Sequence, residues 1–304
     1  ERVFGMRVGI EGVLGDHLVD LSGQSPATLA GLRRTPSSAL GSSRLKLQEQ
    51  HFPPLLDQLR RYDIRYLFMI GGNDTMDTIH RVTQYAAEHG HEMHGIGVPK
   101  TVDNDLFGTD HTPGFPSAAR FVALSVLQAG LLARDMQKVD QFVVFQTVGP
   151  PHLVLLPELP YQRDRFLAAV QEAHTRHGFV SIVCGEGITN PDGSPVSASE
   201  TRDKFQNVEF GAMGGASAAM ILHRIISQAF GWRGEFQVTE SLQMCAADRG
   251  VTLDFEEAYG CGQQAVHLAE QGRSGVMVTI DRLGSSPYAI TFGEIPLSEV
   301  ANHE

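Results

Sequence analysis

Two short polar segments of the chain, residues 71–75 and 99–105, each follow an apolar run of the kind that forms a buried strand. The first segment reads Gly-Gly-Asn-Asp-Thr and leads into apolar residues at helical spacing, so Gly71 and Gly72 are expected where a strand meets a helix N-terminus. Free backbone N–H groups and the helix dipole favour a bound phosphate at such a junction. The second segment reads Pro-Lys-Thr-Val-Asp-Asn-Asp. This density of polar groups is typical of a site that holds a cation, a phosphate or a transferable proton.

Regular elements must position these segments, and the sequence pattern indicates the α/β class. Apolar runs of strand length alternate with amphipathic stretches of helix length, which predicts a mostly parallel sheet covered by helices on both faces. The predicted strands are residues 66–70, 94–98, 142–145, 180–184 and 275–280. The predicted helices are residues 52–62, 75–89, 117–137, 163–177, 216–229 and 254–271.

The composition excludes several classes of protein. With 304 residues, 42% of them hydrophobic, the chain is long enough for a substantial core and for two domains. Its formal net charge of −11 argues against a nucleic-acid or anionic-membrane partner. Three widely spaced cysteines, Cys184, Cys245 and Cys261, predict neither a disulfide framework nor a zinc site. Because no run approaches a membrane span and no signal peptide is recognisable, we expect a cytoplasmic protein.

Further motifs lie before and after the two polar segments in a defined order. They include Gly-Ser-Ser-Arg at 41–44, Thr-Asp-His-Thr-Pro-Gly-Phe at 109–115, Pro-His-Leu at 151–153 and Gly-Glu-Gly at 185–187. Together with the two polar segments, these motifs resemble the phosphofructokinase family over nearly the whole chain. The resemblance implies two doubly wound, Rossmann-like domains with mostly parallel sheets, and a phosphotransferase of glycolysis.

Two positions make the pyrophosphate-dependent branch of that family the closest match. The resemblance implies that an aspartate at Asp74 and a lysine at Lys100 replace two glycines of the ATP-using enzymes. The aspartate then crowds the space that a nucleotide needs, and the lysine acts as a catalytic group that meets the phosphoryl group. The implied reaction moves a phosphoryl group from pyrophosphate to the 1-hydroxyl of fructose 6-phosphate, with Mg²⁺ as cofactor.

The resemblance also implies roles for single residues. Asp103 is the general base that accepts the proton of the sugar hydroxyl. Asp105 assists the metal or positions the base, and Thr101 bonds a substrate phosphate or hydroxyl. Asn73 stands where many relatives carry a magnesium-binding aspartate, so the metal is expected at Asn73 and Asp103. Arg44 resembles the arginine that clamps the phosphoryl donor.

Glu186 matches a family glutamate that hydrogen-bonds the sugar. Each of these residues also has a purely structural interpretation. Residues 99–105 then form a turn that caps the next element, and Asp74 is an ordinary N-cap carboxylate. In the same interpretation Arg44 is a solvated surface residue, and Glu186 belongs to a strand-end turn.

The acceptor side departs from the family pattern. A Met-Gly-Arg motif and its helix are missing, because residues 147–150 run straight on to Pro151. The family pattern places an arginine at each end of the 235–244 stretch, and this chain has Glu235 and Met244 there. A carboxylate in a phosphate clamp repels the ligand.

Three interpretations of these departures stay open. In the first, the chain is an active enzyme whose missing cations come from unusual positions such as Arg163, Arg165 or Arg202. In the second, it is a family member with a different acceptor. In the third, it is a non-catalytic or regulatory subunit that assembles with active relatives.

By resemblance, residues 1–137 and 244–293 form the phosphoryl-donor domain, and residues 138–243 and 294–304 form the sugar-phosphate domain. The expected partners are pyrophosphate and fructose 6-phosphate, in a homodimer, a homotetramer or a hetero-oligomer with an intact relative. The chain begins beyond the family's first glycine-rich loop and stops where relatives continue, so we expect segments to be missing at both ends.

Overall fold

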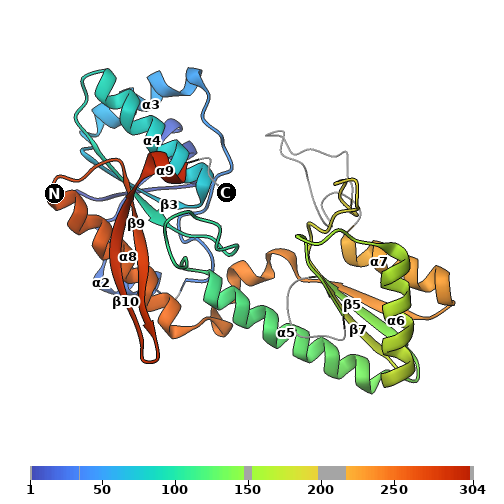
Figure 1. Cartoon of the computed structure of the whole chain (residues 1–304). Coiled ribbons are helices and arrows are strands. Elements are labelled where there is room, and N and C mark those ends of the chain that lie inside the picture. Colours follow the sequence, from blue (N-terminus) through green and yellow to red (C-terminus); the bar gives the residue numbers. More distant parts are fainter. Residues whose placement is uncertain (1, 34, 147–152, 198–216, 302–304) are drawn as a thin grey trace. The chain divides into compact units, whose positions relative to one another are not determined.

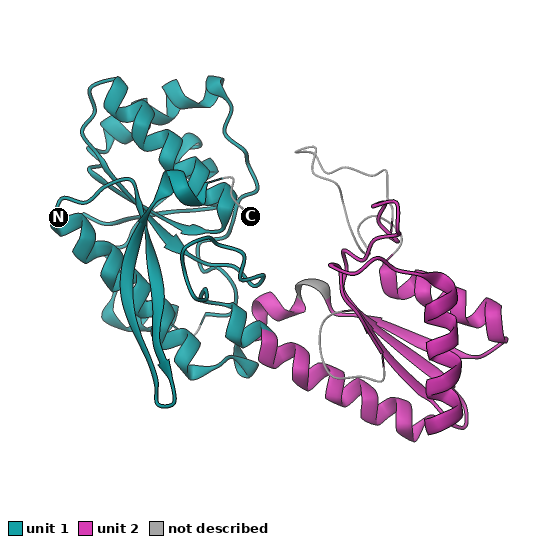
Figure 2. Ribbon diagram, in the orientation of Figure 1, with its two compact units in different colours: residues 1–118, 247–304 teal, residues 119–246 magenta. Residues whose placement is uncertain are grey.

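The computed structural model describes residues 2–33, 35–146, 153–197 and 217–301. The chain divides into two compact units, residues 1–118 with 247–304, and residues 119–246 (Figure 2). The long helix α5 (Phe115–Asp135) begins in the first unit and continues in the second.

The first unit is built on a four-stranded sheet with the order β10-β9-β4-β3 (Figure 1). Strands β3 (Tyr66–Gly71), β4 (His94–Pro99) and β9 (Val276–Ser285) run parallel, and β10 (Tyr288–Pro296) runs antiparallel to β9. Two three-residue strands, β1 (Phe4–Met6) and β2 (Leu18–Asp20), form a separate antiparallel pair.

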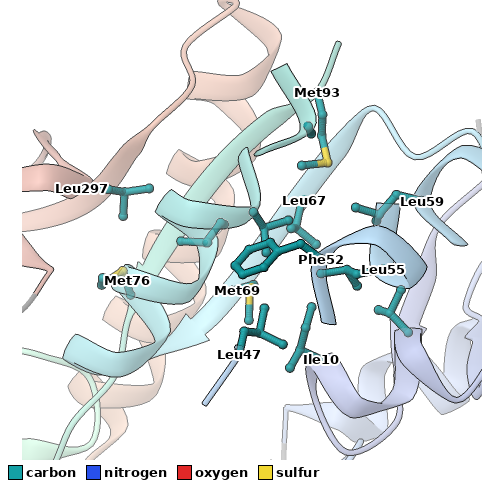
Figure 3. Packing of buried hydrophobic residues seen from close by; sticks show 14 of the residues in the cluster. Ile10, Leu47, Phe52, Leu55, Leu59, Leu67, Met69, Met76, Met93 and Leu297 are labelled. Carbon is teal, nitrogen blue, oxygen red and sulfur yellow. The ribbon is translucent and has the colours of Figure 1, made fainter. Parts of the chain in front are cut away.

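Helices cover both faces of the first sheet, since neighbouring residues of its strands enter different cores. Met277 belongs to the cluster with α1 (Ile10–Leu14), α3 (Phe52–Arg61), α4 (Asn73–Glu88) and α9 (Leu297–Val300), part of which is drawn in Figure 3. Val276 and Val278 belong to the cluster with α8 (Thr252–Glu270). Successive strand residues point to opposite faces, so α8 packs against the face opposite α4.

The helices form where apolar residues recur at helical spacing. In α3, residues Phe52, Leu55, Leu56 and Leu59 are buried, which is one continuous stripe of the helix. The remaining short elements of this unit are α2 (Pro26–Leu32) and the 3₁₀ turns Glu49–His51 and Ala247–Arg249.

The second unit contains a parallel sheet with the order β6-β7-β5-β8. Its strands are β5 (Phe142–Gln146), β6 (Leu153–Leu155), β7 (Val180–Cys184) and β8 (Gly234–Val238). Helices α6 (Arg163–His177) and α7 (Ala218–Phe230) share a core with Val144 and Ile182. Phe145 and Val183 pack with α5 on the other face, and a 3₁₀ segment, Glu240–Cys245, follows β8.

The predicted fold class is confirmed: the protein is an α/β protein with mostly parallel sheets. The domain limits differ from those expected. Residues 119–137 belong to the second unit, because the buried face of α5 packs on β5 and β7. Residues 294–301 belong to the first unit, because β10 extends its sheet to Pro296 and α9 packs into its core.

Helix α5 also corrects the expectation that no run approaches a membrane span. Its 21 residues are long and apolar enough to cross a bilayer by length and composition alone. Phe121, Val122 and Val126 are nevertheless buried against Phe145 and Val183. Helix α5 is therefore a partly buried core helix.

Candidate functional site

The two polar segments lie side by side at the carboxyl edge of the first unit's sheet. Gly71, the last residue of β3, pairs with Pro99, the last residue of β4. The backbone N–H of Lys100 donates a hydrogen bond to the carbonyl of Gly71 at 3.1 Å. Ligands of open parallel sheets bind outside this edge. The structure thus brings the glycines of the first segment and Lys100 of the second to one place.

The two glycines of the first segment differ in what they permit. A Cβ on Gly71 would lie 2.1 Å from Oγ1 of Thr75, so only glycine lets β3 turn directly into α4. A Cβ on Gly72 would have no neighbour closer than the carbonyl oxygen of Lys100 at 3.8 Å. Gly72 is the N-cap of α4 and supplies no side-chain cap. The first turn of α4 therefore keeps N–H groups that a phosphate oxygen can bind.

Asp74 in that first turn is paired with a lysine that the sequence analysis missed. Nζ of Lys46 lies 3.3 Å from Oδ1 of Asp74, and both side chains are exposed. Twenty-eight positions separate the two residues in the sequence, and no spacing rule connects them. The only available signal was proximity to the Gly-Ser-Ser-Arg motif. Lys46 adds a positive charge to a site that was expected to hold Lys100 and Arg44.

Arg44 lies on the same irregular segment as Lys46. The exposed residues Arg44 and Lys46 alternate with the more buried Ser43, Leu45 and Leu47. Ser43 anchors the segment, since its hydroxyl donates to the carboxylate of Glu11 and accepts the N–H of Leu45 at 3.0 Å. Arg44 is therefore exposed two positions before the lysine that reaches Asp74.

The second segment holds Asp103 in a defined turn. The N–H of Asp103 donates to Oγ1 of Thr101 at 3.1 Å, and Thr101 itself is 7% exposed. Asp103 is exposed, yet partial burial of its carboxylate, and next the negative charge of Asp105, raise the pKa of Asp103 above its ordinary value. Lys100 and the Thr101 hydroxyl oppose this rise. A carboxyl group with a raised pKa is a stronger proton acceptor than an ordinary aspartate.

Asn104, between the two aspartates, anchors the turn. Its φ of 57° is left-handed, a conformation that asparagine tolerates better than most residues. Its Oδ1 accepts the N–H of Thr112 at 3.0 Å, and its Nδ2 donates to the carbonyl of Asp110 at 3.4 Å. The side chain of Asn104 therefore ties the turn to the following motif, while Asp103 and Asp105 remain exposed.

A magnesium ion fits this site only if substrate phosphates and water supply most of its ligands. Oδ1 of Asn73 is buried without a hydrogen-bond partner, as the oxygen of a metal ligand would be. Among the residues that the structure describes, no group of three or more His, Cys, Asp or Glu is arranged for a metal. Mg²⁺ typically takes one or two protein ligands and completes its shell with substrate phosphates and water. Asn73 and Asp103 match that limited ligand set.

On the second unit, Glu186 also lies at the carboxyl edge of a sheet. It follows β7 by two residues and is exposed. The preceding Gly185 donates its N–H to the carbonyl of Leu155 at 3.0 Å, and a Cβ on Gly185 would lie 2.7 Å from Pro157. Glycine is thus required for the chain to pass Pro157 and present Glu186.

The structure corrects the expectation that Glu235 lies in the phosphate clamp: within one chain, it is at the wrong edge of the sheet. Glu235 is the second residue of β8 and pairs with Val143 near the start of β5, at the amino edge of the sheet. Glu186 lies beyond the opposite edge, roughly 16 Å farther along the strand direction at about 3.3 Å per residue. Glu235 and Glu186 therefore cannot contact one phosphate group on the same chain. Met244 lies in the 3₁₀ segment after β8 and is 55% exposed.

Two of the arginines that were expected to replace the missing cations lie at the carboxyl edge of the second sheet, where Glu186 also lies. Arg163 and Arg165 are exposed in the first turn of α6. The N–H of Tyr161 donates to the carbonyl of Thr189 at 2.7 Å, which ties the start of α6 to the loop that follows Glu186. Arg202 and the 147–150 stretch, where the Met-Gly-Arg motif was expected, lie outside the residues that the structure describes.

Comparisons with known proteins connect this geometry to a family. Residues 1–269 match the model of the family described as phosphofructokinase. The chain is 35% identical to a pyrophosphate–fructose 6-phosphate 1-phosphotransferase of Halomonas elongata over 100% of its own length and 77% of that protein. It is 28% identical to a sulfofructose kinase of Alkalicoccus urumqiensis, over 97% and 80% of the two chains. Its fold matches the crystal structure of a pyrophosphate-dependent phosphofructokinase from Nitrosospira multiformis with a TM-score of 0.87 and 32% identity, over 100% of this chain and 76% of that one.

Proposed function

Because this chain belongs to the phosphofructokinase family, we propose that it transfers a phosphoryl group from pyrophosphate to the 1-hydroxyl of fructose 6-phosphate. The observation that carries this proposal is the charged first turn of α4, where the Asp74–Lys46 pair lies next to the junction of Gly71 with Lys100. By family resemblance, Asp74 occupies space that a nucleotide would need. Pyrophosphate is smaller than ATP because it has no base or ribose, and it requires cations and helix N–H groups in place of a nucleoside pocket.

The donor is held by charges from three parts of the first unit. The N-terminus of α4 attracts the phosphate oxygens through its dipole. Arg44 and Lys46 are exposed on the segment that precedes α3, and Lys100 is exposed just after β4. The guanidinium of Arg44 is suited to bind two phosphate oxygens at once, whereas the lysines act as point charges.

Transfer of the phosphoryl group requires one proton to move. Asp103 accepts the proton of the sugar 1-hydroxyl as the hydroxyl oxygen forms a bond to the terminal phosphorus of pyrophosphate. The bond from that phosphorus to the bridging oxygen breaks, and inorganic phosphate leaves with both bonding electrons. Lys100 offsets the negative charge that develops on this leaving group. The products are a sugar bisphosphate and inorganic phosphate.

Asn73 and Asp103 are the residues that would hold Mg²⁺. When bound with the donor, the ion neutralises phosphate charge and orients the phosphoryl group for in-line attack. Asp74 is less suited to this role, because its carboxylate is already paired with Lys46.

Donor identity is tested with the purified chain, Mg²⁺, fructose 6-phosphate and either pyrophosphate or ATP. We expect sugar bisphosphate only from pyrophosphate, and some ATP use after Asp74 and Lys100 are both changed to glycine. The matched control changes Asp57 and Lys138, which are exposed residues outside this site, to glycine. Robust ATP-dependent activity of the unmodified chain, with none from pyrophosphate, would falsify the donor assignment.

A different acceptor is the second candidate, favoured by the absence of the expected arginine at Met244 and by the likeness to a sulfofructose kinase. A panel of sugar phosphates and sulfosugars, assayed with pyrophosphate, separates the two. Turnover of a sulfosugar that exceeds turnover of fructose 6-phosphate supports the different acceptor. Turnover of none of them, followed by activity on adding an intact relative, indicates the non-catalytic subunit.

A further inference from the structure

A histidine buried between two carboxylates lies behind the 99–105 segment of the first unit. His111 is 5% exposed; its Nδ1 lies 2.8 Å from Oδ2 of Asp110, and its Nε2 lies 2.7 Å from Oε2 of Glu257. Glu257 belongs to α8 and is 4% exposed. A neutral imidazole donates from one nitrogen only, so two carboxylate partners favour the protonated ring, which donates from both. Burial alone lowers the pKa of His111, but the hydrogen bonds to Glu257 and Asp110 outweigh burial and raise it.

Two side chains of the β9–β10 hairpin complete this network. Arg282 donates to Oδ2 of Asp110 from Nε at 3.0 Å and from Nη2 at 2.9 Å. The hydroxyl of Tyr288 donates to Glu257. Burial, and next this bond, raise the pKa of Tyr288 to about 12, so it remains a donor at neutral pH. His111 and Glu257 form the buried part of this network, and Asp110 and Arg282 extend it to the surface.

The other titratable groups of α8 that face this region are Asp254 and Cys261. Asp254 lies about one turn before Glu257 and accepts the N–H groups of Gly114 and Ser117, at 2.9 and 3.2 Å. Cys261 lies about one turn after Glu257 and is buried, and burial raises the pKa of its thiol to about 12. The Cys261 thiol therefore stays neutral between pH 6 and 9 and does not compete with His111.

The network is connected to Asp103 through the residue after His111. The N–H of Thr112 donates to Oδ1 of Asn104, and Oγ1 of Thr112 donates to the carbonyl of Thr101 at 2.9 Å. Thr101 in turn accepts the N–H of Asp103. Thr112, the neighbour of His111, thus holds the residues on both sides of the Asp103 turn.

We propose that Glu257 and His111 are positioning residues, whose buried pair fixes the conformation of residues 101–112 and so holds the Asp103 carboxylate in place. The consequence for catalysis rests on the proposed function, whereas the conformational consequence does not. Loss of the His111 proton leaves one ring nitrogen without a hydrogen facing a carboxylate, so the loop loosens as the pH rises. Activity then declines on the alkaline side through the loss of this contact.

The test uses Glu257→Gln in the full chain, with Glu256→Gln as the matched control. Glu256 is the adjacent residue of α8 and is exposed. Hydrogen exchange is followed at the N–H groups of Asp103 and Thr112, with amides of α4 as an internal reference. We expect at least about tenfold faster exchange at both loop amides in Glu257→Gln, and no change in Glu256→Gln or in α4.

Steady-state kinetics over pH 6 to 9 give the second readout. We expect Glu257→Gln to lower kcat about tenfold with little change in KM for pyrophosphate, and to move the alkaline decline to lower pH. Tyr288→Phe, which removes only the outer contact of Glu257, should give a smaller change of the same kind. It replaces Glu257→Gln as the test if that variant does not fold.

The outcomes separate this inference from the proposed function. Unchanged loop exchange overturns the positioning role, whatever the activity. Faster loop exchange with an unchanged kcat and pH profile also overturns it. Faster loop exchange in a chain that shows no turnover supports the positioning of the loop and counts against the proposed reaction.

Discussion

The ammonium group of Lys46 lies 3.3 Å from the carboxylate of Asp74, at the first turn of α4. An exposed ion pair of this kind contributes little to stability, about 0–1 kcal/mol. Its significance lies in its position, because the first turn of a helix that begins at the carboxyl edge of a parallel sheet is an anion site. Lys46 is thus held beside the site without being required for the fold.

We predict that Lys46→Met weakens pyrophosphate binding and leaves stability unchanged. One charge-assisted bond contributes about 1.5–3 kcal/mol, so KM for pyrophosphate should rise about 10- to 100-fold. Lys138→Met is the matched control, since Lys138 is an exposed lysine of the second unit. Steady-state kinetics and thermal denaturation are measured for both variants. An unchanged KM in Lys46→Met would remove Lys46 from the donor site.

The two adjacent glycines provide a test that separates folding from binding. Gly71→Ala places a methyl group 2.1 Å from Oγ1 of Thr75, so we expect a loss of about 1–3 kcal/mol in the free energy of unfolding. Gly72→Ala meets no atom closer than 3.8 Å and should change stability by less than about 1 kcal/mol. If pyrophosphate lies on the α4 N-terminus, Gly72→Ala nevertheless raises its KM. Urea denaturation and kinetics of both variants check this contrast, which equal destabilisation would contradict.

The local elements were predictable because each has its own periodic pattern. The expected bounds of α6 and β7 agree with the structure, and those of α3 and α4 differ by at most two residues. The three-residue strands β1 and β2 are too short for a period-2 signal, and we did not predict them.

Contacts between distant residues were not predictable in the same way. The Gly71–Lys100 junction followed from parallel pairing, because the ends of neighbouring parallel strands must meet. The Lys46–Asp74 pair and the His111–Glu257 pair depend on how separate segments pack, for which a single sequence has no periodic signal. The position of Glu235 at the amino edge could likewise be known only from the register of β8 on β5.

We predict that Asp103→Asn abolishes phosphoryl transfer and slightly stabilises the fold. Loss of one general base commonly lowers kcat by a factor of about 10² to 10⁴. The pKa of Asp103 is higher in the folded than in the unfolded chain, so above this pKa its charged form destabilises the folded state. Removing the charge at neutral pH should therefore raise Tm or leave it unchanged. Asp57→Asn is the control, and an Asp103→Asn variant with full activity removes Asp103 from the mechanism.

The acid side of the pH profile depends on the neighbouring aspartate. Transfer needs Asp103 ionised, so activity is present above its folded pKa and is lost as the pH falls through it. The negative charge of Asp105 contributes to the raised pKa of Asp103. We therefore expect Asp105→Asn to shift the acid limb of kcat/KM to lower pH, measured at saturating Mg²⁺. If the acid limb of kcat/KM does not move, or moves to higher pH, the ionisation of Asp103 does not set that limb.

On the acceptor side, we predict that the lone chain binds fructose 6-phosphate weakly, with a Kd of about 1 mM or higher. A phosphate monoester needs charge-assisted bonds of about 1.5–3 kcal/mol each, and Met244 stands where the family pattern places an arginine. Glu235 lies at the amino edge of its sheet, so within one chain it neither binds nor repels a ligand beside Glu186. By family resemblance, we expect a neighbouring subunit to supply part of the missing positive charge, so a mixed oligomer with an intact relative should bind fructose 6-phosphate more tightly.

The residual binding should depend on the start of α6. Arg163 and Arg165 lie in its first turn, at the edge where Glu186 follows β7, and the helix dipole adds to their charge. Changing both to glutamine should weaken binding at least about tenfold. Arg176→Gln, which removes an exposed arginine paired with Glu172 at the other end of α6, should not. Calorimetric titration with fructose 6-phosphate measures each variant. Micromolar binding by the unmodified chain, unaffected by the Arg163 and Arg165 changes, would show that other cations complete the acceptor site.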